Sequence, residues 1–274
     1  SDYFFIASLL AGMNIEHTIE NLPGGAGFKP TRTANLFLMD ALRTPADPDD
    51  MFKYAAHAVL ELPEQELAER WRWPRAPKIP VILGNPPYNR WSPNPARWLG
   101  KALPTWKGGT RNSKALNDDY VKFLRLATKT LKEAGKGVLG YIIPNGWLAG
   151  PDYSKMRGQL CETFANIDVL DLHGSVIGKA PTGGQDESVF LIKSGVCLLT
   201  ASYKGPGTGG VRSATIRTKV TWGELWGSRS DKLWALGRDP SAVVSREILP
   251  REPMYLFNSA VTVTGPDRHR QDVL

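Results

Sequence analysis

The segment Asn85-Pro86-Pro87-Tyr88 combines residue types that could transfer a group to an unreactive amine. The exocyclic amine of adenine is such a group, because its lone pair is delocalised into the ring. The Asn85 side-chain oxygen and the Pro86 carbonyl could accept hydrogen bonds from its two N–H groups, while the prolines fix the backbone and remove competing donors. Tyr88 would offer a ring face to a base that has left the duplex stack. These residues predict catalysis by positioning and electrostatics, without a covalent enzyme intermediate.

The position of this segment argues against a simple turn, although Asn-Pro and Pro-Pro are also common turn dipeptides. A buried strand over residues 79–83 is predicted to run straight into it, and open α/β sheets bind ligands outside the carboxyl ends of their strands. A second short strand, over 34–41, carries Asp40 at its end. Because adjacent strands are about 4.8 Å apart, we predict that Asp40 and Asn85 lie side by side at one edge of a sheet.

The rest of the chain predicts strands that alternate with helices. The expected strands are 34–41, 79–83, 137–143, 167–172, 188–192 and 196–203, and the expected helices are 3–21, 51–70, 117–134 and 156–164. This order indicates an α/β protein with a Rossmann-like, mostly parallel sheet covered on both faces, with antiparallel pairing near its end. Residues 89–116 are longer than a usual connection, which favours a functional or mobile loop.

Composition bounds the class of protein. With 274 residues, 42% hydrophobic and 22% charged, the chain is typical of a globular protein, and it has no apolar run long enough to span a membrane. Two cysteines in apolar surroundings suit a reducing, cytoplasmic compartment, and the four histidines show no metal-ligand spacing, so no metal is predicted. The net charge of +7 suits a nucleic-acid partner. Basic residues interleaved with tryptophans between Arg70 and Lys136 suit phosphates and bases, and equally a solvated face over buried rings.

Seven sequence blocks carry a resemblance to a known family. They are VILGNPPYN (81–89), NDDYVKFLRLA (117–127), GVLGYIIPNGWLAG (137–150), MRGQLCETFANIDVLDLHGS (156–175), KAPTGGQDESVF (179–190), TWGELWGSRSDKLWAL (221–236) and PMYLF (253–257). With these blocks the chain resembles the N6-adenine DNA methyltransferases with an Asn-Pro-Pro-Tyr signature. Within that group it is similar to the methylase portion of single-chain type ISP restriction-modification enzymes.

The resemblance implies a role for several residues. Asn85, Pro86, Pro87 and Tyr88 would form the catalytic signature, and Asp40 would accept a hydrogen bond from the adenine of the cofactor, S-adenosylmethionine. Phe190 would flank the flipped base opposite Tyr88. The implied partner is double-stranded DNA with a flipped adenine, and nuclease and helicase regions would belong to the parent chain or a partner. From sequence alone, Asp40 could equally cap a turn, and Phe190 is better explained as a core aromatic of a strand.

The chain departs from the family where the cofactor should be held. The family's glycine-rich loop is expected well before Asp40, but Gly24–Gly27 follows a predicted helix, lacks the acidic residue and has no ribose-binding carboxylate after it, so it indicates a connecting loop. We therefore expect a sheet incomplete at its N-terminal side. The predicted domains are 1–204, a partial methyltransferase catalytic domain, and 205–274, a small appendage leading toward a target-recognition region. The isolated chain is expected to be a fragment without detectable activity.

The sequence thus predicts an adenine-specific DNA methyltransferase of restriction-modification or phage defence. One alternative is methylation of a glutamine side-chain nitrogen in a protein, which uses the same acceptor geometry; the basic stretch 89–114 and the later blocks argue against it. The other is a catalytically inactive DNA-binding fragment, which the missing cofactor loop makes credible.

Overall fold

The computed structural model describes residues 81–90, 106, 113–175, 186–190, 192–206, 211–212, 215–216, 218–238 and 243–258. The chain divides into two compact units, Ser1–Ala76 and Pro77–Leu274, and every described residue lies in the second unit. Asp40, Gly24–Gly27 and the elements predicted before residue 77 lie outside the described residues. The prediction that Asp40 and Asn85 are neighbours therefore stays a prediction.

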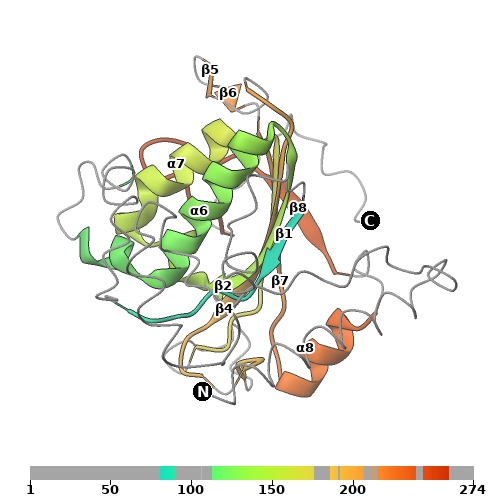
Figure 1. Cartoon of the computed structure of the whole chain (residues 1–274). Helices are drawn as coiled ribbons and strands as arrows, with labels where there is room; N and C mark the ends of the chain where they lie inside the picture. The colour runs from blue at the N-terminus through green and yellow to red at the C-terminus, as the bar shows by residue number, and fades with distance from the viewer. Residues whose placement is uncertain are drawn as a thin grey trace, which may run out of the picture. The chain divides into compact units, whose positions relative to one another are not determined.

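Six strands form the main sheet of the described part (Figure 1). They are β1 (Val81–Gly84), β2 (Gly137–Pro144), β3 (Asn166–Asp171), β4 (Val196–Tyr203), β7 (Lys219–Glu224) and β8 (Ser245–Ile248), and their order across the sheet is β1-β2-β4-β3-β7-β8. The pairs β1–β2 and β3–β7 are parallel, whereas β4 is antiparallel to both β2 and β3, and β8 to β7. Strands β1, β2, β3 and β7 therefore all point the same way.

This arrangement confirms the predicted α/β, Rossmann-like sheet and corrects one detail. The antiparallel strand β4 lies in the middle of the sheet, between β2 and β3, and not only near its end. Residues of β2 and β4 alternate between buried and less buried positions over much of their length, as strands with one better covered face do. A separate two-stranded ribbon joins β5 (Val211–Arg212) and β6 (Thr215–Ile216).

The longer helices match the predicted ones closely. Helix α6 (Asp119–Ala134) begins after Asp118 and ends at Gly135, which adopts a left-handed φ of 83° and donates its N–H to the Lys132 carbonyl. Helix α7 (Ser154–Thr163) lies beside α6 on one side of the sheet (Figure 1). Short 3₁₀ helices, η1 (Ser113–Asn117), η2 (Asn145–Leu148) and η3 (Pro151–Tyr153), precede these helices. Among the described helices, none has the length and apolar character needed to cross a membrane.

Two findings concern the later part of the chain, residues 188–192 and residues 205–274. The strand predicted over 188–192 is wrong, because its described residues form bends: the Ile192 N–H donates to the Phe190 carbonyl at 2.8 Å, a tight local turn that a sheet ladder does not allow. Residues 205–274, which were predicted to form a small appendage, contain the ribbon β5–β6, the helix α8 (Arg229–Leu236) and two strands, β7 and β8, that pair within the main sheet. The predicted domain boundary itself stays a prediction.

A buried arginine fastens the PMYLF segment to the helical layer. Arg157 of α7 is fully buried, and its guanidinium donates to the carbonyls of Trp147 (2.5 Å), Gly150 (2.8 Å), Met254 (2.5 Å) and Tyr255 (2.8 Å). Burial lowers the pKa of Arg157 to about 10. Backbone carbonyls thus compensate the buried charge, and residues 254–257 become part of the packed fold.

Candidate active site at the carboxyl edge of the sheet

The signature lies directly after the carboxyl end of β1, as the sequence predicted, but β1 is not the buried strand that was expected: Val81 and Leu83 are 53% and 75% exposed. The parallel register with β2 places Gly84 opposite Tyr141, and a Cβ atom on Gly84 would lie only 3.3 Å from the Tyr141 ring. The side chain of Pro86 is buried, that of Tyr88 is half-buried, and that of Asn85 is exposed. Glycine at position 84 therefore lets the chain pass close to β2 while Asn85 faces outward at the edge.

Tyr88 holds the Asn85 carboxamide in place. The Tyr88 hydroxyl oxygen lies 2.6 Å from Asn85 Oδ1, to which it donates, and 3.2 Å from the Ile142 carbonyl oxygen of β2. Burial raises the pKa of Tyr88 to about 12, so the hydroxyl keeps its proton and acts as a donor at neutral pH. A carboxamide oxygen has two lone pairs, and one remains for a second N–H donor.

The far end of the signature loop is anchored to α6. Asn89 donates its side-chain N–H to Asp119 Oδ2 at 3.2 Å, and the Asn89 carbonyl accepts the Asp119 backbone N–H at 3.1 Å. Asp119 in turn forms a buried ion pair with Lys122 at 3.1 Å. The loop is thus fixed at β1, at β2 through Tyr88, and at the first turn of α6.

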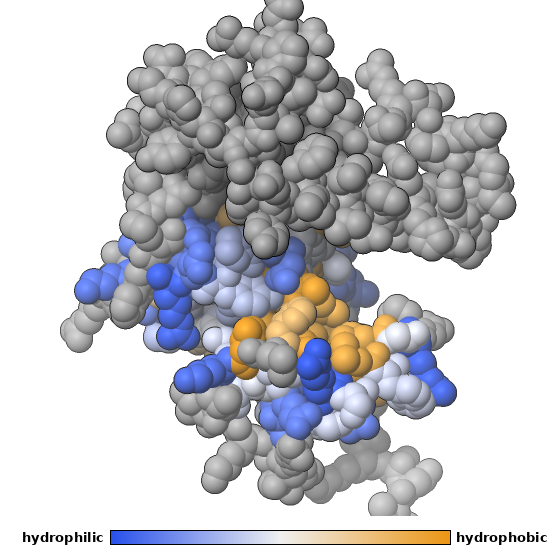
Figure 2. Space-filling view, turned by 60° about the horizontal axis from the view of Figure 1, so that its bottom comes forward, coloured by the Kyte–Doolittle hydropathy of each residue, from blue (hydrophilic) through white to orange (hydrophobic). Residues whose placement is uncertain are grey.

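The structure brings together the two aromatic residues that the sequence analysis assigned to the base. Tyr88 and Phe190 are both partly buried against one apolar cluster formed by Leu172, Val189 and Val196. Phe190 lies in the 186–190 loop, so its interpretation as a strand aromatic is wrong, and the base-flanking role stays a prediction. Viewed from the bottom of Figure 1, hydrophobic residues gather in one area among hydrophilic ones (Figure 2).

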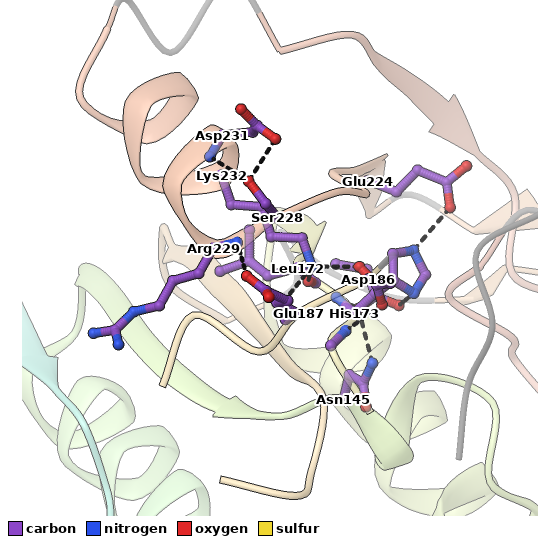
Figure 3. A network of polar contacts seen from close by, with 12 residues as sticks. Asn145, Leu172, His173, Asp186, Glu187, Glu224, Ser228, Arg229, Asp231 and Lys232 are labelled. Atoms are coloured by element: carbon purple, nitrogen blue, oxygen red, sulfur yellow. Dashed lines mark hydrogen bonds and ion pairs between the residues drawn. The ribbon is translucent and has the colours of Figure 1, made fainter. Parts of the chain in front are cut away.

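A polar network that the sequence analysis missed occupies the same edge (Figure 3). Asn145, just after β2, donates to Asp171 Oδ1 at 2.9 Å, and so does the backbone N–H of His173. His173 Nε2 lies 3.0 Å from Glu224 Oε2 at the end of β7, and the His173 ring stacks on Trp226 with centroids 3.4 Å apart. Burial raises the pKa of the Asp171 carboxyl, opposed by His173 and by the Asn145 hydrogen bond.

The sequence could have indicated this network, because its polar residues end strands or directly follow them. The φ of 48° at His173, followed by 81° at Gly174, forms a turn in left-handed backbone conformation. Within the described residues, no group of three or more His, Cys, Asp or Glu side chains is placed to hold a metal ion.

Comparison with known proteins agrees with this architecture. The family model of the Eco57I restriction-modification methylases matches residues 43–177. No curated protein matches the chain significantly.

Several solved structures share the fold. They include the ATP-dependent type ISP restriction-modification enzyme LlaBIII bound to DNA (21% identity, 90% of this chain, 16% of that chain, TM-score 0.60) and a nuclease-deletion mutant of the type ISP enzyme LlaGI in complex with a DNA substrate mimic (18%, 90%, 23%, 0.62). A DrdV–DNA complex solved by cryo-electron microscopy matches at 21% identity over 69% of this chain and 18% of that chain, with a TM-score of 0.56. The chain thus spans less than a quarter of the length of these proteins.

The family match includes the whole Asn-Pro-Pro-Tyr signature, its anchor at Asp119 and the strands β1 to β3. Over residues 43–177, just under half of the chain, this protein is thus similar to the Eco57I restriction-modification methylases.

Proposed function

We propose that the enzyme containing this chain transfers a methyl group from S-adenosylmethionine to the N6 amine of adenine in DNA, as part of a cytoplasmic restriction-modification system. One observation carries the proposal. An exposed carboxamide oxygen, Asn85 Oδ1, is held by the Tyr88 hydroxyl at the carboxyl edge of a Rossmann-like sheet, beside an apolar cluster shared by Tyr88 and Phe190.

The residues of the site suit an adenine that has left the helix. Asn85 Oδ1 has a lone pair left for one N6–H, and the Pro86 carbonyl is the proposed acceptor for the other. When both N–H groups donate hydrogen bonds to these oxygens, the nitrogen lone pair is directed out of the ring plane, where it can attack the methyl group. Tyr88 and Phe190 are proposed to hold the two faces of the base, because flipped bases are read by stacking as well as by hydrogen bonds.

S-adenosylmethionine, when bound, would supply the electrophilic methyl group. We propose that Asp40 accepts a hydrogen bond from the adenine of this cofactor. Among the described residues, the signature is the part whose chemistry can be compared with the cofactor. There the chemistry agrees: the exposed Asn85 oxygen is an acceptor rather than a nucleophile, so this side chain positions the amine and leaves the transfer itself to the bound methyl donor. The net charge of +7 suits the proposed DNA partner.

The test is transfer of a labelled methyl group to DNA that lacks adenine methylation, with N6-methyladenine identified in the hydrolysed product. Asn85→Ala should lower the rate by about 10²–10³-fold, the usual cost of one preorganised polar partner. Asn166→Ala is a matched control, because Asn166 begins β3, at the edge of the sheet opposite to the signature, and its side chain donates to the Ser202 hydroxyl at 2.9 Å. Label found on protein instead of DNA, or full turnover by Asn85→Ala, would refute the proposal.

A further inference from the structure

The loop that carries Phe190 is fastened by a lysine from a distant helix. Lys232 is the only buried residue of α8, and its side chain is 0% exposed. Its ammonium group donates to Asp186 Oδ1 at 2.5 Å, to the Glu187 carbonyl at 2.7 Å and to the Leu172 carbonyl at 2.7 Å (Figure 3). All three N–H donors are thus used, and two of the three acceptors belong to the loop.

Further contacts join the same three segments. Asp186 Oδ2 accepts the Gly174 N–H at 2.7 Å, so one carboxylate bridges the end of β3 and α8. Glu187 donates its backbone N–H to the Gly227 carbonyl at 3.0 Å, and its side chain accepts the Arg229 N–H at 2.8 Å. Residues 186–187 are therefore held from both sides, three positions before Phe190.

The loop also packs tightly against the turn that follows β3. A Cβ atom added to Gly174 would lie 2.4 Å from the Ser188 Cα. Val189, the next residue, is 5% exposed and belongs to the apolar cluster against which both Tyr88 and Phe190 pack. The buried charge pair at Asp186 and the apolar contacts of Val189 thus hold the loop at two positions only three residues apart.

From this geometry we propose that Lys232 is a positioning residue for methyl transfer: through Asp186 and the Glu187 carbonyl it places the loop that presents Phe190 to the target base. The inference depends on the proposed function, because it assigns Phe190 to the base site. Lys232 itself does not touch the base. A buried ammonium without its partners is costly, so the charge pair selects one loop conformation over others.

The experiment compares Lys232→Met with Lys129→Met in the enzyme that contains this chain. Lys129 is an exposed lysine of α6 whose side chain is 52% exposed, so it controls for loss of a lysine charge. Methyl transfer to unmethylated DNA is measured as kcat and as KM for DNA. Loss of base stacking predicts a fall in kcat/KM of about 10- to 100-fold for Lys232→Met, and none for Lys129→Met.

A double-mutant cycle with Phe190→Ala separates positioning from general destabilisation. If Lys232 acts through Phe190, Lys232→Met should cost little more once Phe190 has been removed. Hydrogen exchange should rise in residues 186–192 and stay unchanged in α6. An equal loss in both backgrounds, or unchanged kcat/KM in Lys232→Met, overturns the inference.

A milder variant covers the case in which Lys232→Met does not fold. Asp186→Asn keeps an oxygen for Lys232 but removes the negative charge, and it should lower kcat/KM in the same direction by a smaller factor. Full activity of a folded Asp186→Asn enzyme would overturn the inference. Loss of activity in Asn85→Ala together with full activity in Lys232→Met refutes only the role of Lys232, whereas full activity in Asn85→Ala refutes the proposed function and this inference with it.

Discussion

The Tyr88 hydroxyl gives the sharpest test of how the signature works. If Tyr88 served the base only through its ring face, Tyr88→Phe would keep nearly full activity. The structure adds a second role, because the hydroxyl donates to Asn85 Oδ1 at 2.6 Å and also lies 3.2 Å from the Ile142 carbonyl. Removing it would free the Asn85 carboxamide to rotate and leave its acceptor oxygen less well aimed.

The expected magnitudes form a graded series. A net hydrogen bond is worth about 0.5–1.5 kcal/mol, so Tyr88→Phe should lower kcat by about 2- to 10-fold. Tyr88→Ala loses the stacking face as well, worth about 1–3 kcal/mol per base, so the combined loss should reach about 10²–10³-fold. Asn85→Ala should show at least the loss of Tyr88→Phe, because it removes the group that the hydroxyl positions.

The assay is labelled-methyl transfer to unmethylated DNA at saturating cofactor, with thermal unfolding to confirm the fold of each variant. The pH profile adds an independent check. The pKa of Tyr88 is raised to about 12, so folding favours the protonated hydroxyl. The contribution of this protonated hydroxyl to stability is complete below the ordinary tyrosine pKa of 10 and is lost only as the pH rises through about 12. Wild-type kcat in Tyr88→Phe would refute the positioning role, and equal losses in Tyr88→Phe and Tyr88→Ala would refute the stacking role.

Three further predictions follow from burial and from the expectation that the chain lacks the family's cofactor loop. Arg157→Met should lower the free energy of unfolding by about 3 kcal/mol or more, since it leaves several buried carbonyls without a donor, while Lys129→Met changes it little; equal denaturant midpoints would contradict this. Burial raises the pKa of both thiols, that of Cys161 to about 12, so at pH 8 iodoacetamide should label Cys161 and Cys197 only after unfolding, as mass spectrometry can show. The isolated chain should bind S-adenosylmethionine about 100-fold more weakly than a complete enzyme; micromolar affinity by calorimetry would show that Gly24–Gly27 is a working loop.

Much of the local structure could be predicted because its signals are local. The end of α6 follows from Gly135, whose left-handed conformation suits glycine. The strand into the signature follows from Val81 to Gly84, a short apolar run that ends in a residue small enough to pass Tyr141. The reason for glycine at position 84, its close approach to Tyr141, became clear only from the pairing of β1 with β2.

The bent backbone conformation found within residues 188–192 could not be predicted from local signals. Their apolar run has the pattern of a strand, but the carbonyls and side chains around it are taken by partners far along the chain, Lys232 above all. A local sequence pattern does not reveal a hydrogen bond between residues that are 45 or 46 positions apart. The central place of β4 was hidden for a similar reason, since pairing order depends on contacts between strands and not on the strands' own residues.

The sequence by itself therefore determined the class of chemistry: an amide oxygen, two prolines and an aromatic ring at the end of a short apolar strand, within blocks that resemble those of a methylase. Only the tertiary structure decided which groups support that chemistry. In the folded chain the Tyr88 hydroxyl binds Asn85, and Tyr88 and Phe190 pack against one apolar cluster. A lysine of α8 binds the loop that carries Phe190. The physical reason is that residue types fix what a group can donate, accept or stack upon, whereas distance and burial, which the folded chain alone sets, fix which groups meet.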